Sequence, residues 1–111
     1  MAAIVTLTLN PAVDVFCSAQ RVGAEHKIRC DPPRRDPGGG GVNVARAIRA
    51  LGGETLAVYA SGGPTGLLLD RLIEREALPS FAVRIRDLTR ENFTVLETGT
   101  GREFRSPCPG R

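Results

Sequence analysis

The sequence has no tryptophan, a single histidine and three cysteines, and each scarcity argues against a class of site. His26 alone builds neither a Ser-His-Asp triad nor a histidine metal site. Cys17, Cys30 and Cys108 are an odd number and contain no Cys-x-x-Cys pair, so zinc and a disulfide framework are both poorly supported. We expect no metal site, and we interpret the thiols as buried or interface residues.

Long hydrophobic runs and clustered basic charge are also missing. No apolar run approaches the roughly 20 residues that cross a bilayer, and no basic segment followed by an apolar stretch indicates secretion. The 15 basic residues are all arginine except Lys27, but they are scattered, and the formal net charge is only +3. With few aromatic residues for stacking, this pattern argues against a nucleic-acid partner. We expect a cytoplasmic protein without a membrane or nucleic-acid partner.

The 111 residues are interpreted as a single α/β unit, 1–111. Three apolar, β-branched runs are typical of strands buried on both faces. These runs span residues 3–9, 55–60 and 80–85. Because helical patterns lie between them, their order predicts a parallel sheet with helical crossovers.

The first helix is predicted to follow the glycines at 38–41 and to end at Gly52 and Gly53. Its apolar stripe is expected to contain Val44, Ala45, Ile48 and Leu51. The second helix is predicted to begin with Thr65 as its N-cap. Its Asp70 is expected to face water.

Four further segments alternate between apolar and polar residues, which is typical of a sheet with one exposed face. They span residues 13–18, 26–31, 92–98 and 102–106. The last two are expected to form a hairpin around Gly99-Thr100-Gly101. Residues 31–37 are expected to form an extended connector, and Asn92 is interpreted as a turn or cap residue.

Four consecutive glycines, Gly38 to Gly41, lead into the first predicted helix. Because glycine is costly in chain entropy, such a run indicates a backbone shape that side chains would block. Its free N–H groups and the positive end of the helix dipole favour an oxygen-rich or anionic ligand. The alternative is a functionless turn. A P-loop does not fit, since Val42-Asn43 stands where Lys-Ser or Lys-Thr is required, and the spacing also differs from the dinucleotide fingerprint.

Two segments together carry a resemblance to a known family. Residues 37–46, Pro-Gly-Gly-Gly-Gly-Val-Asn-Val-Ala-Arg, and residues 6–14, Thr-Leu-Thr-Leu-Asn-Pro-Ala-Val-Asp, resemble the PfkB (ribokinase-like) carbohydrate kinases, and within them the phosphosugar kinases. The resemblance covers essentially the whole chain. It implies the N-terminal portion of a ribokinase-like three-layer α/β core with a small antiparallel β lid. The lid strands are expected at approximately 12–31 and 91–107.

A sugar phosphate needs hydroxyl acceptors and cations, and the resemblance assigns residues to both tasks. Asp14 can accept hydrogen bonds from two hydroxyls, and Arg90 can pair with a phosphate bidentately. The expected substrate-binding residues are Asp14, Lys27, Arg29, Gly38, Gly39, Asn43 and Arg90. The alternatives are a solvated strand position for Asp14, a solvated face for Lys27 and Arg29, and a surface pair between Arg90 and Glu91.

The resemblance implies transfer of the γ-phosphoryl group of ATP, with Mg²⁺, to the C1 hydroxyl of fructose 6-phosphate. The family's Asp-Thr-x-Gly-Ala-Gly-Asp loop, which carries the catalytic aspartate, does not occur in this sequence. We therefore assign no catalytic residue, expect most of the ATP and Mg²⁺ sites outside this chain, and expect the chain alone to be inactive. Open alternatives are a kinase for tagatose 6-phosphate or fructose 1-phosphate, and a non-catalytic sugar-phosphate-binding or interaction module.

The face of the alternating strands opposite Asp14 is predicted to be exposed and apolar. It contains Val13, Val15, Cys17, Ile28 and Cys30. An exposed apolar face of this kind tends to find a partner. The resemblance likewise implies a homodimer through the lid sheet.

Overall fold

The computed structural model describes residues 4–22 and 30–107. The predicted strand at 26–31 lies mostly outside these residues, as does Cys108. In chain order the described residues form β1 (Ile4–Thr8), β2 (Ala12–Ala19), β3 (Arg34–Gly38), α1 (Gly40–Ala50), β4 (Thr55–Ser61), α2 (Gly63–Arg75), β5 (Ser80–Arg84), β6 (Arg90–Glu97) and β7 (Arg102–Pro107). None of the described helices is long and apolar enough to cross a membrane.

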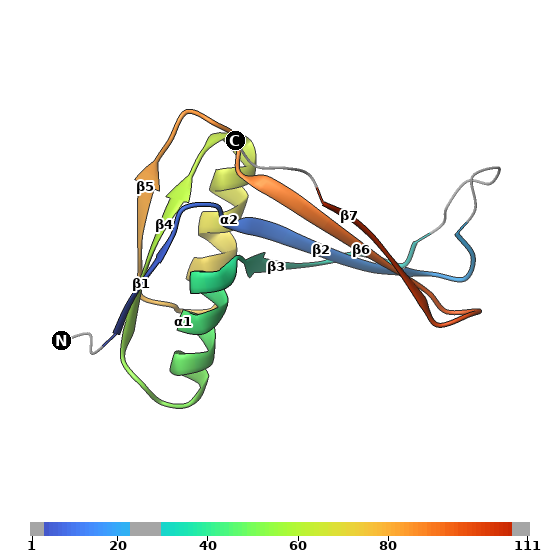
Figure 1. The fold of residues 1–111 in the computed structure, drawn as a ribbon, viewed down its shortest axis with the longest axis horizontal. Helices are drawn as coiled ribbons and strands as arrows, with labels where there is room; N and C mark the ends of the chain where they lie inside the picture. The colour runs from blue at the N-terminus through green and yellow to red at the C-terminus, as the bar shows by residue number, and fades with distance from the viewer. Residues whose placement is uncertain (1–3, 23–29, 108–111) are drawn as a thin grey trace.

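The first layer is a parallel sheet in the order β1-β4-β5, with α1 and α2 packed on one of its faces (Figure 1). Ala57 and Tyr59 of β4 meet Leu69, Leu72 and Ile73 of α2 in the buried core. This arrangement confirms the α/β fold class and the parallel sheet. In the described residues the helices cover one face of the sheet, so the prediction of strands buried on both faces is wrong for this part of the chain.

The second layer, which we call the outer sheet, has the order β3-β2-β6-β7 and extends away from the core (Figure 1). Its β6–β7 hairpin around Gly99-Thr100-Gly101 confirms the prediction. The β2–β6 pair is parallel, so the sheet is mixed rather than purely antiparallel. Residues 34–37 of the expected connector form strand β3 instead, together with Gly38. Pro37 is accommodated because β3 is an edge strand, where a missing N–H donor is tolerated.

The first helix differs from its prediction in start and orientation. It begins at Gly40, inside the glycine run, with Gly39 as N-cap. Its buried residues are Val42 and Ala45, whereas Val44 and Leu51 are exposed. The first turn of the helix packs closely against β1, since a Cβ on Gly41 would lie 2.3 Å from Thr8 Oγ1.

The second helix begins earlier than predicted and uses its polar residues differently. Gly62 is the N-cap and Thr65 lies inside the first turn. Asp70 does not face water: its carboxylate accepts hydrogen bonds from Tyr59 Oη at 2.6 Å and Ser61 Oγ at 3.1 Å, and it pairs with Arg84 at 2.6 Å. This bonding joins α2 to β4 and β5. The burial of the Tyr59 hydroxyl, and after it the bond to Asp70, raises the pKa of Tyr59.

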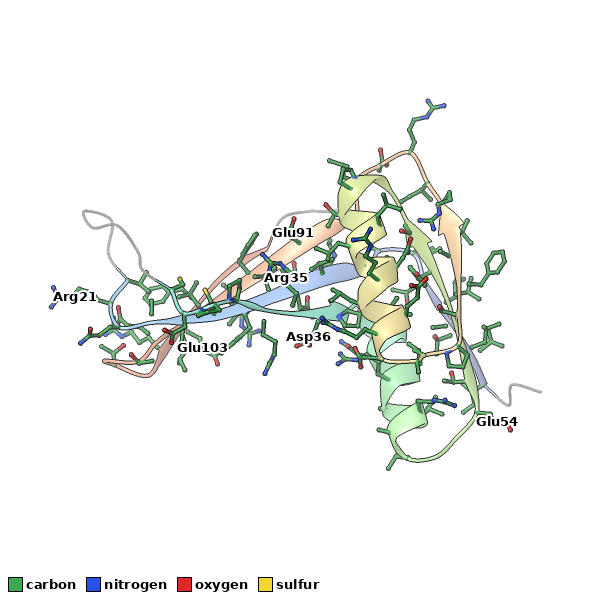
Figure 2. All side chains as sticks on the ribbon, turned by 180° about the vertical axis from the view of Figure 1, so that it is seen from behind. Arg21, Arg35, Asp36, Glu54, Glu91 and Glu103 are labelled. Atoms are coloured by element: carbon green, nitrogen blue, oxygen red, sulfur yellow. The ribbon has the colours of Figure 1, made fainter. Side chains whose placement is uncertain are left out.

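The predicted exposed apolar face of the outer sheet is wrong in its first half. Val13 and Val15 are buried in the core cluster that also contains Leu69 and Leu72 of α2. The outer sheet therefore begins as part of the core and leaves it only beyond Val15. Figure 2 shows the two faces through their charged residues, with Arg35 and Glu91 on one side and Asp36 and Glu103 on the other.

The face of the parallel sheet away from the helices carries a continuous set of exposed apolar side chains. Val5 and Leu7 of β1 are 61% and 65% exposed, and Phe81 and Val83 of β5 are 62% and 44% exposed, with β4 between the two strands. Monomeric proteins rarely expose such a patch.

We expect the isolated chain to self-associate through this face, and we expect Leu7→Lys to weaken that association, measured by light scattering and sedimentation. Leu51→Lys, at an exposed position beyond α1, is the matched control; equal association of all three proteins would contradict the prediction.

The tip of the outer sheet is held by Glu97, whose carboxylate accepts hydrogen bonds from the Thr100 hydroxyl at 2.5 Å and from Val22 N–H at 2.7 Å. These bonds, the Thr100 bond first, lower the pKa of Glu97 below its ordinary value of 4.5. A lowered pKa in the folded state means that this stabilisation is present above about pH 4.5 and is lost as pH falls through the folded-state value.

We therefore expect Glu97→Gln to lower the urea midpoint of unfolding at pH 7 and to have little effect at pH 3. Glu103→Gln, an exposed carboxylate on the adjacent strand, is the control. A difference between Glu97→Gln and the unchanged protein that persists undiminished at pH 3 would contradict this account.

Candidate functional site

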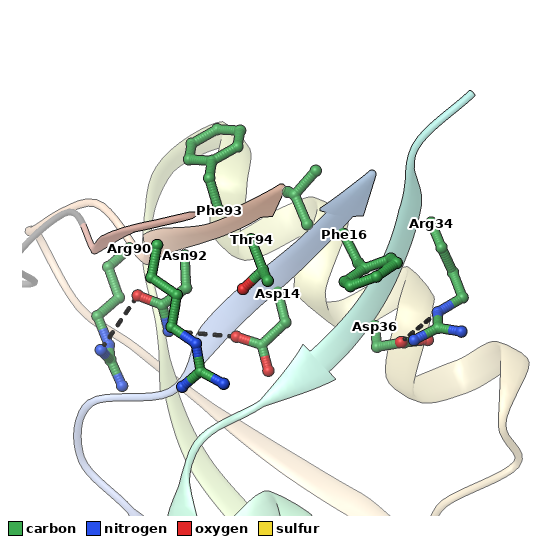
Figure 3. Close-up of a pocket in the computed structure, with 10 residues that line it drawn as sticks. Asp14, Phe16, Arg34, Asp36, Arg90, Asn92, Phe93 and Thr94 are labelled. Carbon is green, nitrogen blue, oxygen red and sulfur yellow. Dashed lines mark hydrogen bonds and ion pairs between the residues drawn. The ribbon is translucent and has the colours of Figure 1, made fainter. Parts of the chain in front are cut away.

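A pocket of about 530 Å³ lies over the face of the outer sheet that carries Asp14 (Figure 3). The sheet register creates it: Asp14 lies opposite Asp36 of β3 on one side and opposite Asn92 of β6 on the other. The residues that line it are Asp14, Val15, Phe16, Arg34, Asp36, Arg90, Asn92, Phe93, Thr94 and Arg105. Three arginines against two aspartates give it a net positive charge, which favours an anionic ligand.

Asp14 and the glycine run meet directly. A Cβ on Gly38 would lie 2.2 Å from Asp14 Oδ2, so the carboxylate occupies the space that any side chain at position 38 would need. Gly39 has a φ of 110°, in the region that favours glycine, and a Cβ there would lie 2.9 Å from the Pro11 Cα. The glycine run is therefore shaped by its neighbours, which argues against a featureless turn.

Arg90 is held in place before any ligand arrives. Its Nε and Nη2 both donate to the backbone carbonyl of Asn10, at 3.3 and 3.2 Å, and its Nη1 donates to Asn92 Oδ1 at 3.4 Å. A guanidinium has five N–H donors, so one remains on each terminal nitrogen. Two neighbouring donors of this kind match two oxygens of a phosphate.

The segment that delivers Arg90 is anchored to the end of β4. Thr89 N–H donates to Gly62 O, and Gly62 N–H donates to Thr89 Oγ1, both at 3.0 Å. Ile85 N–H donates to Ser61 O at 3.0 Å. These bonds fix the passage from the core into β6 and thereby the position at which Arg90 leaves the core.

Asn43 lies outside the pocket, and two further expected site residues lie outside the described part of the chain. Asn43 is exposed on α1 and accepts a hydrogen bond from Arg46 at 3.4 Å; it does not line the pocket. Arg46 also donates to Pro37 O and pairs with Glu76, which ties α1 to β3 and to the segment after α2. Lys27 and Arg29 lie outside the described residues, so their expected roles stay predictions.

Sequence reasoning missed several residues of the pocket. Asn92 lies inside β6, where its amide donates to Asp14 Oδ1 at 3.2 Å, rather than in a turn or cap. Its spacing of two from Arg90 on a strand was the signal that both share a face. Arg34, which pairs with Asp36 at 3.0 Å and stacks over the Phe16 ring at 5.4 Å, went unnoticed because its segment was expected to be a connector.

Comparison with known proteins gives sequence relatives that match nearly the whole chain. No protein-family model matches the sequence. The chain is 46% identical over 107 residues to ATP-dependent 6-phosphofructokinase isozyme 2 of Mycobacterium tuberculosis, covering 96% of the chain and 32% of the relative. It is 42% identical over 110 residues to the isozyme of the same name in Escherichia coli, covering 99% and 36%. The chain thus spans about a third of the length of these relatives.

A more distant relative and two solved structures extend the comparison. Tagatose-6-phosphate kinase of Staphylococcus epidermidis is 28% identical over 106 residues, covering 96% of the chain and 34% of the relative. E. coli phosphofructokinase-2 in complex with fructose-6-phosphate superimposes with a TM-score of 0.91 at 42% identity, covering 99% of this chain and 36% of that chain. A ribokinase-like protein of Agrobacterium tumefaciens, 14% identical with a TM-score of 0.79, covers 99% and 37% and shows the shared fold alone.

Proposed function

We propose that this chain, which belongs to the PfkB family of ribokinase-like carbohydrate kinases, forms the sugar-phosphate-binding portion of a cytoplasmic ATP-dependent phosphofructokinase. The observation that carries the proposal is the pairing of a hydroxyl acceptor, Asp14, with a prepositioned cation, Arg90, in one pocket. The proposed reaction of the intact enzyme is transfer of the γ-phosphoryl group of ATP to the C1 hydroxyl of fructose 6-phosphate, a step of glycolysis.

Each part of the substrate has a counterpart in the proposed site. The Asp14 carboxylate accepts hydrogen bonds from sugar hydroxyls, and the two outer N–H groups of Arg90 bind phosphate oxygens. Gly38 leaves room for the Asp14 carboxylate and Gly39 for Pro11, because neither has a side chain. Their own contacts to the sugar are proposed from the family resemblance. Lys27, Arg29 and Asn43 complete the proposed set on the strength of the family resemblance.

The described residues offer no comparable set of ligands for the Mg²⁺ that would accompany ATP. Within residues 4–22 and 30–107, no group of three or more His, Cys, Asp or Glu side chains is arranged to hold a metal ion. The pocket instead presents arginines to an anion. We therefore assign no step to ATP or Mg²⁺ on this chain, and the chain is expected to have no kinase activity alone.

Isothermal titration calorimetry with fructose 6-phosphate, tagatose 6-phosphate and fructose 1-phosphate tests the proposal. We expect fructose 6-phosphate to bind most tightly, and unphosphorylated fructose to bind far more weakly because it leaves Arg90 without its anion. The tagatose-6-phosphate kinase of S. epidermidis makes tagatose 6-phosphate the second candidate substrate. Absence of binding to all three sugar phosphates would contradict the proposal.

A second candidate function is a non-catalytic sugar-phosphate-binding module. It shares the pocket and differs only in turnover, so a longer protein containing this chain decides between them. Phosphorylation of fructose 6-phosphate with ATP by that protein supports the kinase. Binding without turnover supports the module.

We also propose that two copies associate through the outer sheets. The burial of Val13 and Val15 leaves Cys17, Val95 and Phe104 on the face of the outer sheet opposite Asp14, and Phe104 is 40% exposed. A tetrameric inhibited form is known for E. coli phosphofructokinase-2. In the Leu7→Lys background, which removes the association expected through the parallel sheet, sedimentation of Phe104→Glu as a monomer where Leu7→Lys alone is a dimer would support this interface; a dimer unaffected by Phe104→Glu would contradict it.

A further inference from the structure

Asn92 occupies a position between the two charged groups of the pocket. It lies on β6 opposite Asp14 of β2 and two residues after Arg90, so all three side chains share one face of the outer sheet. Figure 3 shows Asn92 between Arg90 and Asp14, with a dashed line to each. This placement makes Asn92 the direct connection between the acceptor and the cation.

The two hydrogen bonds of Asn92 use the two ends of its amide in opposite senses. Its Nδ2 donates to Asp14 Oδ1 at 3.2 Å, and its Oδ1 accepts from Arg90 Nη1 at 3.4 Å. A carboxylate only accepts and a guanidinium only donates, so the amide fits in one orientation. Aspartate at this position would lack the donor, and leucine would lack both groups.

The bonding leaves specific atoms for a ligand. On Asp14, Oδ1 is taken by Asn92, while Oδ2 lies against the Gly38 backbone, where no side chain stands. On Arg90, the bonds to Asn10 and Asn92 leave one N–H on each terminal nitrogen. The atoms left over are therefore a carboxylate oxygen for hydroxyls and a donor pair for phosphate.

We propose that Asn92 is a positioning residue that sets the spacing and orientation of Asp14 and Arg90, so that both engage a single sugar phosphate at once. This inference rests on the proposed function. Asn92 itself acts through its two neighbours: its removal frees the Asp14 carboxylate to rotate and leaves the Arg90 guanidinium held by Asn10 alone. Binding of the sugar and binding of the phosphate are then no longer cooperative.

A double-mutant cycle with fructose 6-phosphate as the probe tests this role. The variants are Asn92→Leu, which is close to isosteric, Asp14→Asn, and the two combined. We expect Asn92→Leu to weaken binding roughly tenfold. In the Asn92→Leu background, Asp14→Asn is expected to cost less than about threefold, against roughly 10- to 100-fold in the unchanged protein. Glu91→Gln, the neighbouring position on the opposite face, is the control and should combine additively with Asp14→Asn.

Each outcome of the cycle decides the inference. Non-additivity for Asn92 together with additivity for Glu91 supports positioning. A merely structural loss at Asn92 would weaken fructose 6-phosphate binding by the same factor with and without Asp14→Asn. Additive effects of Asn92→Leu and Asp14→Asn overturn the inference while leaving the proposed function standing. If the unchanged protein fails to bind fructose 6-phosphate, the proposed function falls and the inference with it. Should Asn92→Leu fail to fold, by circular dichroism, Asn92→Ser takes its place in the cycle with the same expected non-additivity.

Discussion

Asp14→Asn is expected to weaken fructose 6-phosphate binding roughly 10- to 100-fold, the range for losing charge-assisted hydrogen bonds worth about 1.5–3 kcal/mol. Asparagine keeps the shape of the side chain, so the space beside Gly38 stays filled and the bond from Asn92 has an acceptor. The change removes the charge and turns one acceptor into a donor. Calorimetric titration measures the loss.

Asp31→Asn provides the matched control for this prediction. It removes the same charge at an exposed position beside the outer sheet and outside the pocket, where Asp31 accepts a bond from the Ser18 hydroxyl of β2. We expect its affinity to stay within about twofold, because charges beyond a Debye length of about 10 Å are largely screened. If Asp14→Asn also binds with full affinity, Asp14 is a solvated strand residue and the proposed site is wrong.

Gly62→Ala is expected to lower the free energy of unfolding by about 3 kcal/mol, at the upper end of the overpacking range. A Cβ at this buried position would lie 1.8 Å from Asp87 O and 2.8 Å from Ile85 O. Both obstacles are backbone atoms, which cannot rotate aside as a side chain would. Because the same segment is anchored by Thr89 before it reaches Arg90, the substitution should also weaken phosphate binding.

Gly40→Ala is the control, since a Cβ there meets nothing within 4 Å. At such a compatible position the substitution is expected to be neutral or to stabilise by up to about 1 kcal/mol. Urea unfolding of both variants gives the comparison. Equal stability of Gly62→Ala and Gly40→Ala would show that the linker from β5 to β6 adapts freely.

The main architecture was accessible from the sequence because local patterns determine it. The β-branched runs and helical periodicity at 55–75 predicted β4 and α2, and the glycine spacing predicted the β6–β7 hairpin. The meeting of Asp14 with Gly38 also followed, through resemblance, from two short motifs. The strand, helix and hairpin depend on residues close together in the chain, whereas the meeting of Asp14 with Gly38 rested on the resemblance alone.

The errors share a different cause, which is pairing between distant segments. Strand β3 was missed because Pro33 and Pro37 suggest a connector, and only its place beside β2 makes it a strand. Burial of Val13 depends on α2, which follows about fifty residues later. Asn92 joins the site through the parallel β2–β6 pairing, a long-range contact that no local pattern reveals.

A crystal structure of the protein grown with fructose 6-phosphate would examine the central claim most directly. Our account predicts the sugar hydroxyls at the free oxygen of Asp14 and the phosphate against the two outer N–H groups of Arg90. A sugar phosphate bound elsewhere on the molecule, with Asp14 and Arg90 in contact only with water, would contradict it.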